Sequence, residues 1–105
     1  MILGLDQRLA QLAAAGQTTT YGQLARDLGL TGPGTIARLT EALEALMDED
    51  AALSQPFRAA VVSGRLAQGL PAIGFFDKAA ALGREVGDPS AFIAAERSAL
   101  RLRFA

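Results

Sequence analysis

The sequence predicts a mainly α-helical fold with a short β element, and three observations support this. Half of the 105 residues are hydrophobic, many of them alanine, and only 6% are aromatic, a composition typical of helices that pack closely together. Apolar residues recur at helical spacing in several segments. One segment, residues 57–63, is instead a short apolar run with β-branched residues. At this length we expect a single domain spanning residues 1–105.

The first half of the chain predicts three helices. The first runs from about residue 3 to 15 and ends at a glycine. The second opens at Thr20, which with Gln23 forms a capping-box pattern. The third runs from about residue 33 to 48 and starts with Pro33, a residue favoured in a first turn. Its buried side is predicted to consist of Ile36, Leu39, Leu43, Leu46 and Met47.

The second half predicts a strand, a loop and two helices. The strand at 57–63 is followed by a glycine-bounded loop. Residues 70–73 either return as a short edge strand, which gives a β-hairpin, or leave 57–63 as a single strand. A helix is expected over 75–82, and the last helix starts at Asp88-Pro89. The apolar side chains of this last helix have two alternative roles, covering the core or forming a homodimer interface, and they are Phe92, Ile93, Leu100 and Phe104.

This order of elements describes a winged-helix-like protein. The helix-turn-helix core covers about 3–50, a wing-like segment about 56–74, and the C-terminal helices about 75–104. In such a fold the N-terminal end of the third helix is free to contact phosphates and base edges. The residues expected to bind duplex DNA are Thr31, Thr35 and Arg38 at that end, Tyr21 on the second helix and Arg65 in the wing loop.

A short motif adds a family resemblance. The run Thr-Thr-Tyr-Gly-Gln-Leu-Ala at 19–25 resembles the entry to the helix-turn-helix of alkylguanine-DNA alkyltransferases and alkyltransferase-like proteins. The resemblance implies minor-groove binding, with Tyr21 matching the family's tyrosine and Arg38 the arginine that enters the space of a flipped base. Residues 70–76 also resemble a stretch of uncharacterised bacterial helix-turn-helix proteins.

The family's catalytic motif is missing from this chain. The stretch closest to the family's Pro-Cys-His-Arg motif is Val-Ser-Gly-Arg at 62–65, where only Arg65 agrees. Ser63 has no histidine beside it to activate it as a nucleophile. We therefore expect lesion recognition or transcription regulation rather than alkyl transfer.

Composition excludes several kinds of chemistry. The chain has no cysteine and no histidine, which removes disulfides, thiolate metal sites and the commonest general base. We therefore expect a non-enzymatic protein without metal or cofactor. No signal peptide or long apolar segment is visible, so a cytoplasmic protein without membrane contact is expected.

The distribution of charge along the chain supports an alternative to DNA binding. The net charge is −1, but residues 41–56 carry five carboxylates and no basic residue, whereas residues 57–84 carry a net charge of +3. The acidic segment is either a solvated face or a docking site for a basic partner. Arg38 is either a groove-reading side chain or a solvated partner of Glu41. The alternative function is a protein–protein interaction or dimerisation module that keeps the fold without binding nucleic acid.

Overall fold

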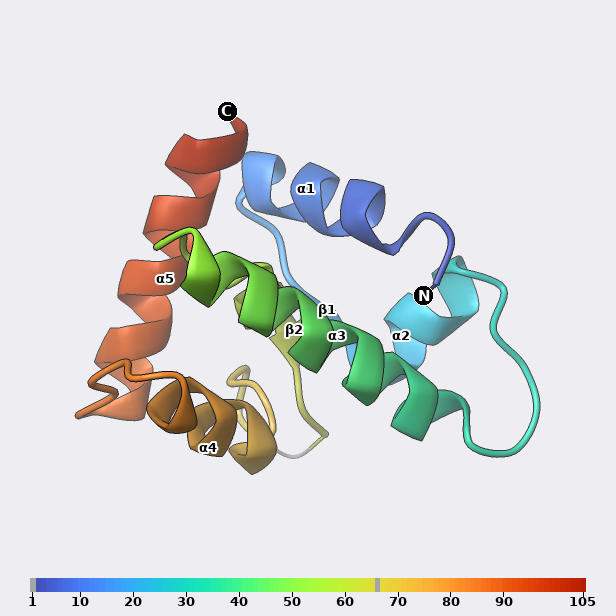
Figure 1. Cartoon of the computed structure of the whole chain (residues 1–105). Coiled ribbons are helices and arrows are strands. Elements are labelled where there is room, and N and C mark those ends of the chain that lie inside the picture. The colour runs from blue at the N-terminus through green and yellow to red at the C-terminus, as the bar shows by residue number, and fades with distance from the viewer. Residues whose placement is uncertain (1, 66) are drawn as a thin grey trace.

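The computed structural model describes residues 2–65 and 67–105, and in this part of the chain it is mainly helical (Figure 1). This confirms the predicted fold class. The elements follow in the order α1 (Leu5–Ala15), β1 (Thr19–Thr20), α2 (Tyr21–Asp27), α3 (Thr35–Ala52), the 3₁₀ helix η1 (Arg58–Val61), β2 (Val62–Ser63), α4 (Ile73–Ala81) and α5 (Pro89–Phe104).

Three helix ends follow the predicted capping residues, whereas α3 starts at Thr35 with Gly34 as its N-cap and not at Pro33. Thr20 Oγ1 accepts a hydrogen bond from the backbone amide of Gln23 at 3.1 Å, and Asp88 accepts one from Ala91 at 2.9 Å. The first helix ends at a glycine in the left-handed conformation. Only half of the capping box forms, because the Gln23 side chain donates to Asp27 at 2.8 Å instead of turning back to Thr20.

The strand prediction is wrong in its extent and in its pairing. Residues 58–61 form a 3₁₀ turn, and the two-residue strand β2 pairs with β1 in parallel, with Val62 opposite Thr19 and Ser63 opposite Thr20. The expected return strand at 70–73 is absent, and Ile73 begins α4. The reason is that the short apolar run at 59–62 is fully buried, and such a run can fill a core in either conformation.

The segment before and within η1 lies at the centre of the molecule. Its apolar side chains are all buried, and they are Phe57, Ala59, Ala60, Val61 and Val62. Helices α1, α3 and α5 all contact η1. Helix α1 also packs against α5, and Figure 1 shows α1 lying across the C-terminal part of α5. Segments from the second half of the chain, η1 and α5, therefore support helices α1 and α3 of the first half.

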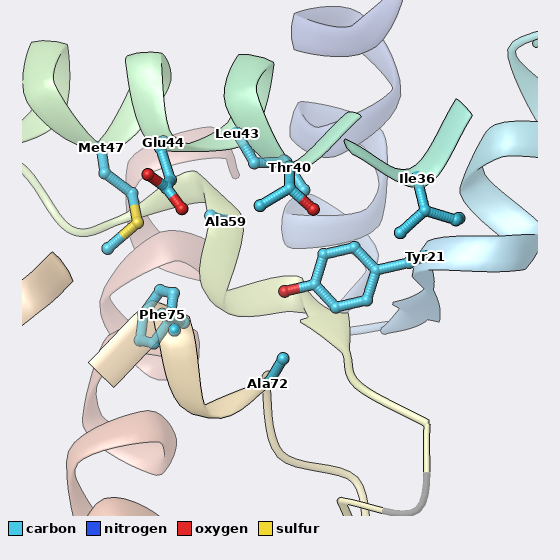
Figure 2. Close-up of a pocket in the computed structure, with 10 residues that line it drawn as sticks. Tyr21, Ile36, Thr40, Leu43, Glu44, Met47, Ala59, Ala72 and Phe75 are labelled. Atoms are coloured by element: carbon cyan, nitrogen blue, oxygen red, sulfur yellow. The ribbon is translucent and has the colours of Figure 1, made fainter. Parts of the chain in front are cut away.

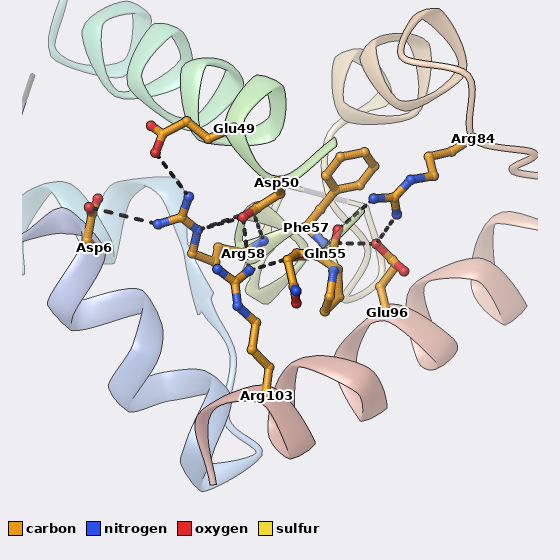
Figure 3. A network of polar contacts seen from close by, with 10 residues as sticks. Asp6, Glu49, Asp50, Gln55, Phe57, Arg58, Arg84, Glu96 and Arg103 are labelled. Carbon is orange, nitrogen blue, oxygen red and sulfur yellow. Dashed lines mark hydrogen bonds and ion pairs between the residues drawn. The ribbon is translucent and has the colours of Figure 1, made fainter. Parts of the chain in front are cut away.

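Buried charged side chains satisfy the backbone of this central segment (Figure 3). Asp50, fully buried near the end of α3, accepts from the Arg58 amide at 2.9 Å and from the guanidinium of Arg103 at 2.9 Å. Glu96 of α5 accepts from the Phe57 amide at 3.0 Å. These bonds replace the ladder that a strand would supply, because a buried amide needs a partner.

Two arginines serve the carbonyl groups of the same region. Arg84 donates to the carbonyl of Gln55 at 2.6 Å and lies over the Phe57 ring, 4.2 Å from its centroid. Arg97 donates to the carbonyls of Ala60 and Gly69, both at 2.8 Å. Burial lowers the pKa of Arg97 below its ordinary value.

Two expectations about apolar residues are resolved. Ile36, predicted to be buried, is 48% exposed, because the first turn of α3 extends beyond the core. The apolar stripe of α5 covers the core: Ile93 and Leu100 are buried, and Phe92 and Phe104 pack partly against them. The stripe therefore serves the chain's own core, the first of its two alternative roles.

Candidate nucleic-acid interface

The turn between α2 and α3 stands open to solvent at the N-terminal end of α3. Thr31 is exposed and Thr35 is partly so. Gly34 caps α3 in the left-handed conformation, and no side chain caps this end. The first amides of α3 therefore face solvent with the positive end of the helix dipole, an arrangement that favours anions.

Three of the five predicted site residues come together at this end, which we call the α3 tip (residues 31–38). The guanidinium of Arg38 donates to the Thr31 carbonyl at 3.2 Å and contacts the Thr35 hydroxyl at 3.5 Å. Thr35 in turn donates to the carbonyl of Gly32 at 2.7 Å. These contacts hold the Arg38 side chain back over the turn, beside the open amides.

The charge around the tip is mildly positive. Arg38 forms no ion pair with any of residues 2–65 and 67–105, so the expected alternative of pairing with Glu41 is not seen. On α2, Arg26 is exposed and donates to the neutral side chain of Gln23 at 3.1 Å. Asp27 is neutralised by Arg8 at 3.5 Å. Two arginines thus remain available to a phosphate.

Tyr21 lines a small apolar pocket of about 140 Å³ between α2, α3 and the start of α4. Its ring extends between Ile36 and Thr40 on one side and Ala72 on the other (Figure 2). The remaining walls are Leu43, Glu44, Met47, Ala59, Gly74 and Phe75. Burial raises the pKa of Tyr21 above 10.0, Glu44 raises it further, and a backbone hydrogen bond with Ala72 partly opposes both.

Tyr21 and Arg38 lie on different sides of α3. Ile36 borders the Tyr21 pocket, whereas Arg38, two residues later, borders a separate groove. At about 100° per residue, two positions place these side chains about 160° apart around the helix axis. The tip therefore separates the two residues that the family resemblance assigns to one site, although a ligand that straddles the tip touches both sides.

The loop after β2 starts beside the N-terminus of α2. Because Ser63 is opposite Thr20 in the parallel pair, the chain leaves β2 next to Tyr21. Arg65 is exposed there. Ser63 itself is buried and donates to the carbonyl of Gly69 at 3.0 Å, so its hydroxyl is committed to the loop and does not face solvent as a nucleophile would.

Sequence reasoning missed the groove on the Arg38 side of α3. This groove of about 550 Å³ lies between the N-terminal segment before and within α1 and one face of α3. It is lined by Ile2, Leu5, Asp6, Arg38, Glu41, Ala42, Ala45, Leu46 and Glu49. The repeat of positions 38, 41, 42, 45, 46 and 49 is a helical-face pattern, but the sequence does not indicate that α1 supplies the opposite wall.

These features define a small, mainly helical protein with an open N-terminal end of α3, an adjacent apolar pocket and a separate groove. Comparison of the chain with protein-family models, with curated proteins and with solved structures found no match. Among the described helices, none is both long and apolar enough to cross a membrane. Across residues 2–65 and 67–105, acidic side chains form no group of three suited to holding a metal ion.

Proposed function

We propose that this protein binds duplex DNA through the α3 tip, without a catalytic step. The observation that carries the proposal is the open N-terminal end of α3, over which Arg38 is held without a carboxylate partner in the described residues. Backbone amides and Thr35 contact phosphates, while Arg38 reaches a groove edge. The loop that carries Arg65 contacts the phosphate backbone of the DNA beside this site.

The motif at 19–25 supports a finer proposal, recognition of a damaged base. Tyr21 stands at the mouth of an apolar pocket, and an apolar receptacle suits a base that has left the stack. The absence of cysteine and the buried hydroxyl of Ser63 are consistent with recognition that does not proceed to alkyl transfer.

The test is a fluorescence-anisotropy titration of a labelled duplex at several salt concentrations. We expect affinity to fall with salt, because phosphate contacts release counterions. Arg38→Ala should weaken binding about tenfold, which corresponds to the loss of about 1.4 kcal/mol. The matched control is Arg101→Ala, which removes the same charge from an exposed position on α5 and should leave binding nearly unchanged.

The same titration separates the finer proposal from the coarser one. A duplex with one alkylated guanine should bind more tightly than the unmodified duplex, and Tyr21→Ala should remove that preference. Equal affinity for both duplexes would leave general DNA binding standing and remove lesion recognition. Equal losses for Arg38→Ala and Arg101→Ala, or no binding at low salt, would overturn DNA binding through this surface.

A further inference from the structure

The groove between α1 and α3 has an apolar floor. Leu5 and Leu46 form its deepest part, each almost fully buried, and Ile2 and Ala42 are partly exposed above them. Ala45 is exposed on the wall. An elongated hollow that exposes apolar atoms beside a helix is the usual receptacle of an amphipathic helix.

The rim of this groove is acidic. Asp6 stands on the α1 wall, and Glu41 and Glu49 stand on the α3 wall. Arg58 lies 3.8 Å from Asp6 and 3.7 Å from Glu49 (Figure 3), but its Nε is 3.1 Å from the buried Asp50, and the Arg58 side chain is only 11% exposed. Arg38, at one end of the groove, is the other cation there. Against the three carboxylates, Arg38 and the largely buried Arg58 offset only part of the rim charge.

Glu41 is an exposed carboxylate on the α3 side of the rim. It forms no ion pair with any residue that the structure describes. Nearby, Glu49 lies in the last turns of α3, where the helix dipole disfavours a carboxylate. A cationic side chain arriving from outside would relieve both, whereas nucleic acid and anionic lipid would be repelled.

We propose that this groove binds a basic amphipathic helix of a partner protein, with apolar side chains on its floor and lysine or arginine against Asp6, Glu41 and Glu49. From Arg38 to Glu49 the groove follows three turns of α3, a length of about 16 Å. An occupant of about 11 helical residues matches that length. The groove shares Arg38 with the α3 tip, but the inference is carried by the apolar floor and the three carboxylates and does not depend on DNA binding.

The experiment uses a labelled peptide of about 14 residues with leucines along one helical face and lysines flanking them. Its binding to the full chain is followed by fluorescence anisotropy. We expect saturable binding, and we expect a peptide with glutamate in place of lysine to bind at least about tenfold more weakly. Ala45→Trp fills the groove and should abolish binding, whereas Ala94→Trp, at an exposed site on α5, should not.

Charge reversal distinguishes the groove from general attraction to an acidic protein. Glu41→Lys should weaken binding of the lysine peptide about tenfold. Glu85→Lys, which makes the same change at an exposed position after α4, should have little effect. Equal losses in the two variants, or unchanged binding in Ala45→Trp, would overturn the proposal. Self-association of the chain that disappears in Ala45→Trp would identify a second copy as the occupant, and would also overturn it.

Discussion

The ionisation of Tyr21 can be followed by absorbance without a contribution from another tyrosine. The chain contains one tyrosine and no tryptophan, so phenolate absorbance in a pH titration arises from this side chain alone. Its ring lies in the pocket between α2 and α3, where burial disfavours the ionised form and Glu44 adds repulsion. The ionisation of Tyr21 therefore measures the polarity of the pocket.

We expect the native protein to titrate with a Tyr21 pKa above 10.0. Glu44→Gln should lower that pKa, whereas Glu41→Gln, on the opposite side of α3, should not. Because the Tyr21 pKa is raised in the folded state, the protonated side chain contributes to the stability of the fold. This contribution is fully present below the unfolded-state pKa near 10.0, and it is lost as the pH rises through the folded-state pKa. A native midpoint at or below that of the unfolded chain would show that the pocket is solvated.

Asp50 is the residue whose role is least evident from the sequence. Its place in a run of acidic residues predicts an exposed side chain, but Asp50 is fully buried between Arg58 and Arg103. The partner Arg103 lies 53 residues further along the chain. The residues near Asp50 in the sequence do not indicate this distant partner. The partial burial of Tyr21, in contrast, can be predicted from its place at a helix start beside apolar residues.

We predict that Asp50→Asn lowers the free energy of unfolding by about 3–5 kcal/mol, because it leaves two buried guanidinium groups without their counter-charge. Asp48→Asn is the matched control. Asp48 pairs with Lys78 at 2.9 Å but is 57% exposed, so its loss should cost no more than about 1 kcal/mol. Urea denaturation followed by circular dichroism measures both, and similar values for the two would contradict the buried network.

At the scale of elements, helices are predicted well and strands poorly. Capping residues such as Thr20 and Asp88 mark helix starts because their hydrogen bonds are local. The strand pair joins residues 19–20 to 62–63, and nothing near either segment specifies the other. The 3₁₀ turn at 58–61 is stabilised by distant side chains, because Glu96 and Asp50 accept from the amides of Phe57 and Arg58 at its start.

In the candidate site too, features formed by neighbouring residues could be predicted, whereas features formed by distant elements could not. The α3 tip was predicted because a turn and a helix start are local features, and Thr31, Thr35 and Arg38 do gather there. The pocket walls Glu44 and Phe75 and the groove between α1 and α3 were not predicted. Each is formed by elements whose mutual placement depends on the core.

In the loop between β2 and α4, the backbone at Gly64 lies close to the backbone at Ala72. A Cβ at Gly64 would lie 2.9 Å from the Cα and N of Ala72. We predict that Gly64→Ala costs about 1–3 kcal/mol, because the loop must shift away from α4. Gly74→Ala, within α4 and with nothing within 4 Å of the added Cβ, should stabilise by up to about 1 kcal/mol. Thermal unfolding of the two variants provides the comparison, and a neutral Gly64→Ala would show that the loop yields easily.

At the scale of the whole molecule, α3 separates two surfaces of different character. Its N-terminal tip is mildly basic, and the groove along its next three turns is acidic. The proposed basic contact to DNA is therefore small. If Arg26 and Arg65 each neutralise one phosphate while Arg38 reaches a groove edge, the slope of log K against log salt in the duplex titration should be about −2. A slope near zero would mean that phosphates are not contacted.

The parallel pairing of β1 with β2 has a consequence for synthesis of the chain on the ribosome. The strand that fixes the entry to α2 finds its partner only at Val62 and Ser63. A nascent chain that has exposed α1, α2 and α3 alone therefore lacks the support that orients them. We therefore expect the tip to reach its final geometry only after the second half of the polypeptide has emerged. A chain that ends between 53 and 62 should carry the three helices without the strand pair that anchors the start of α2.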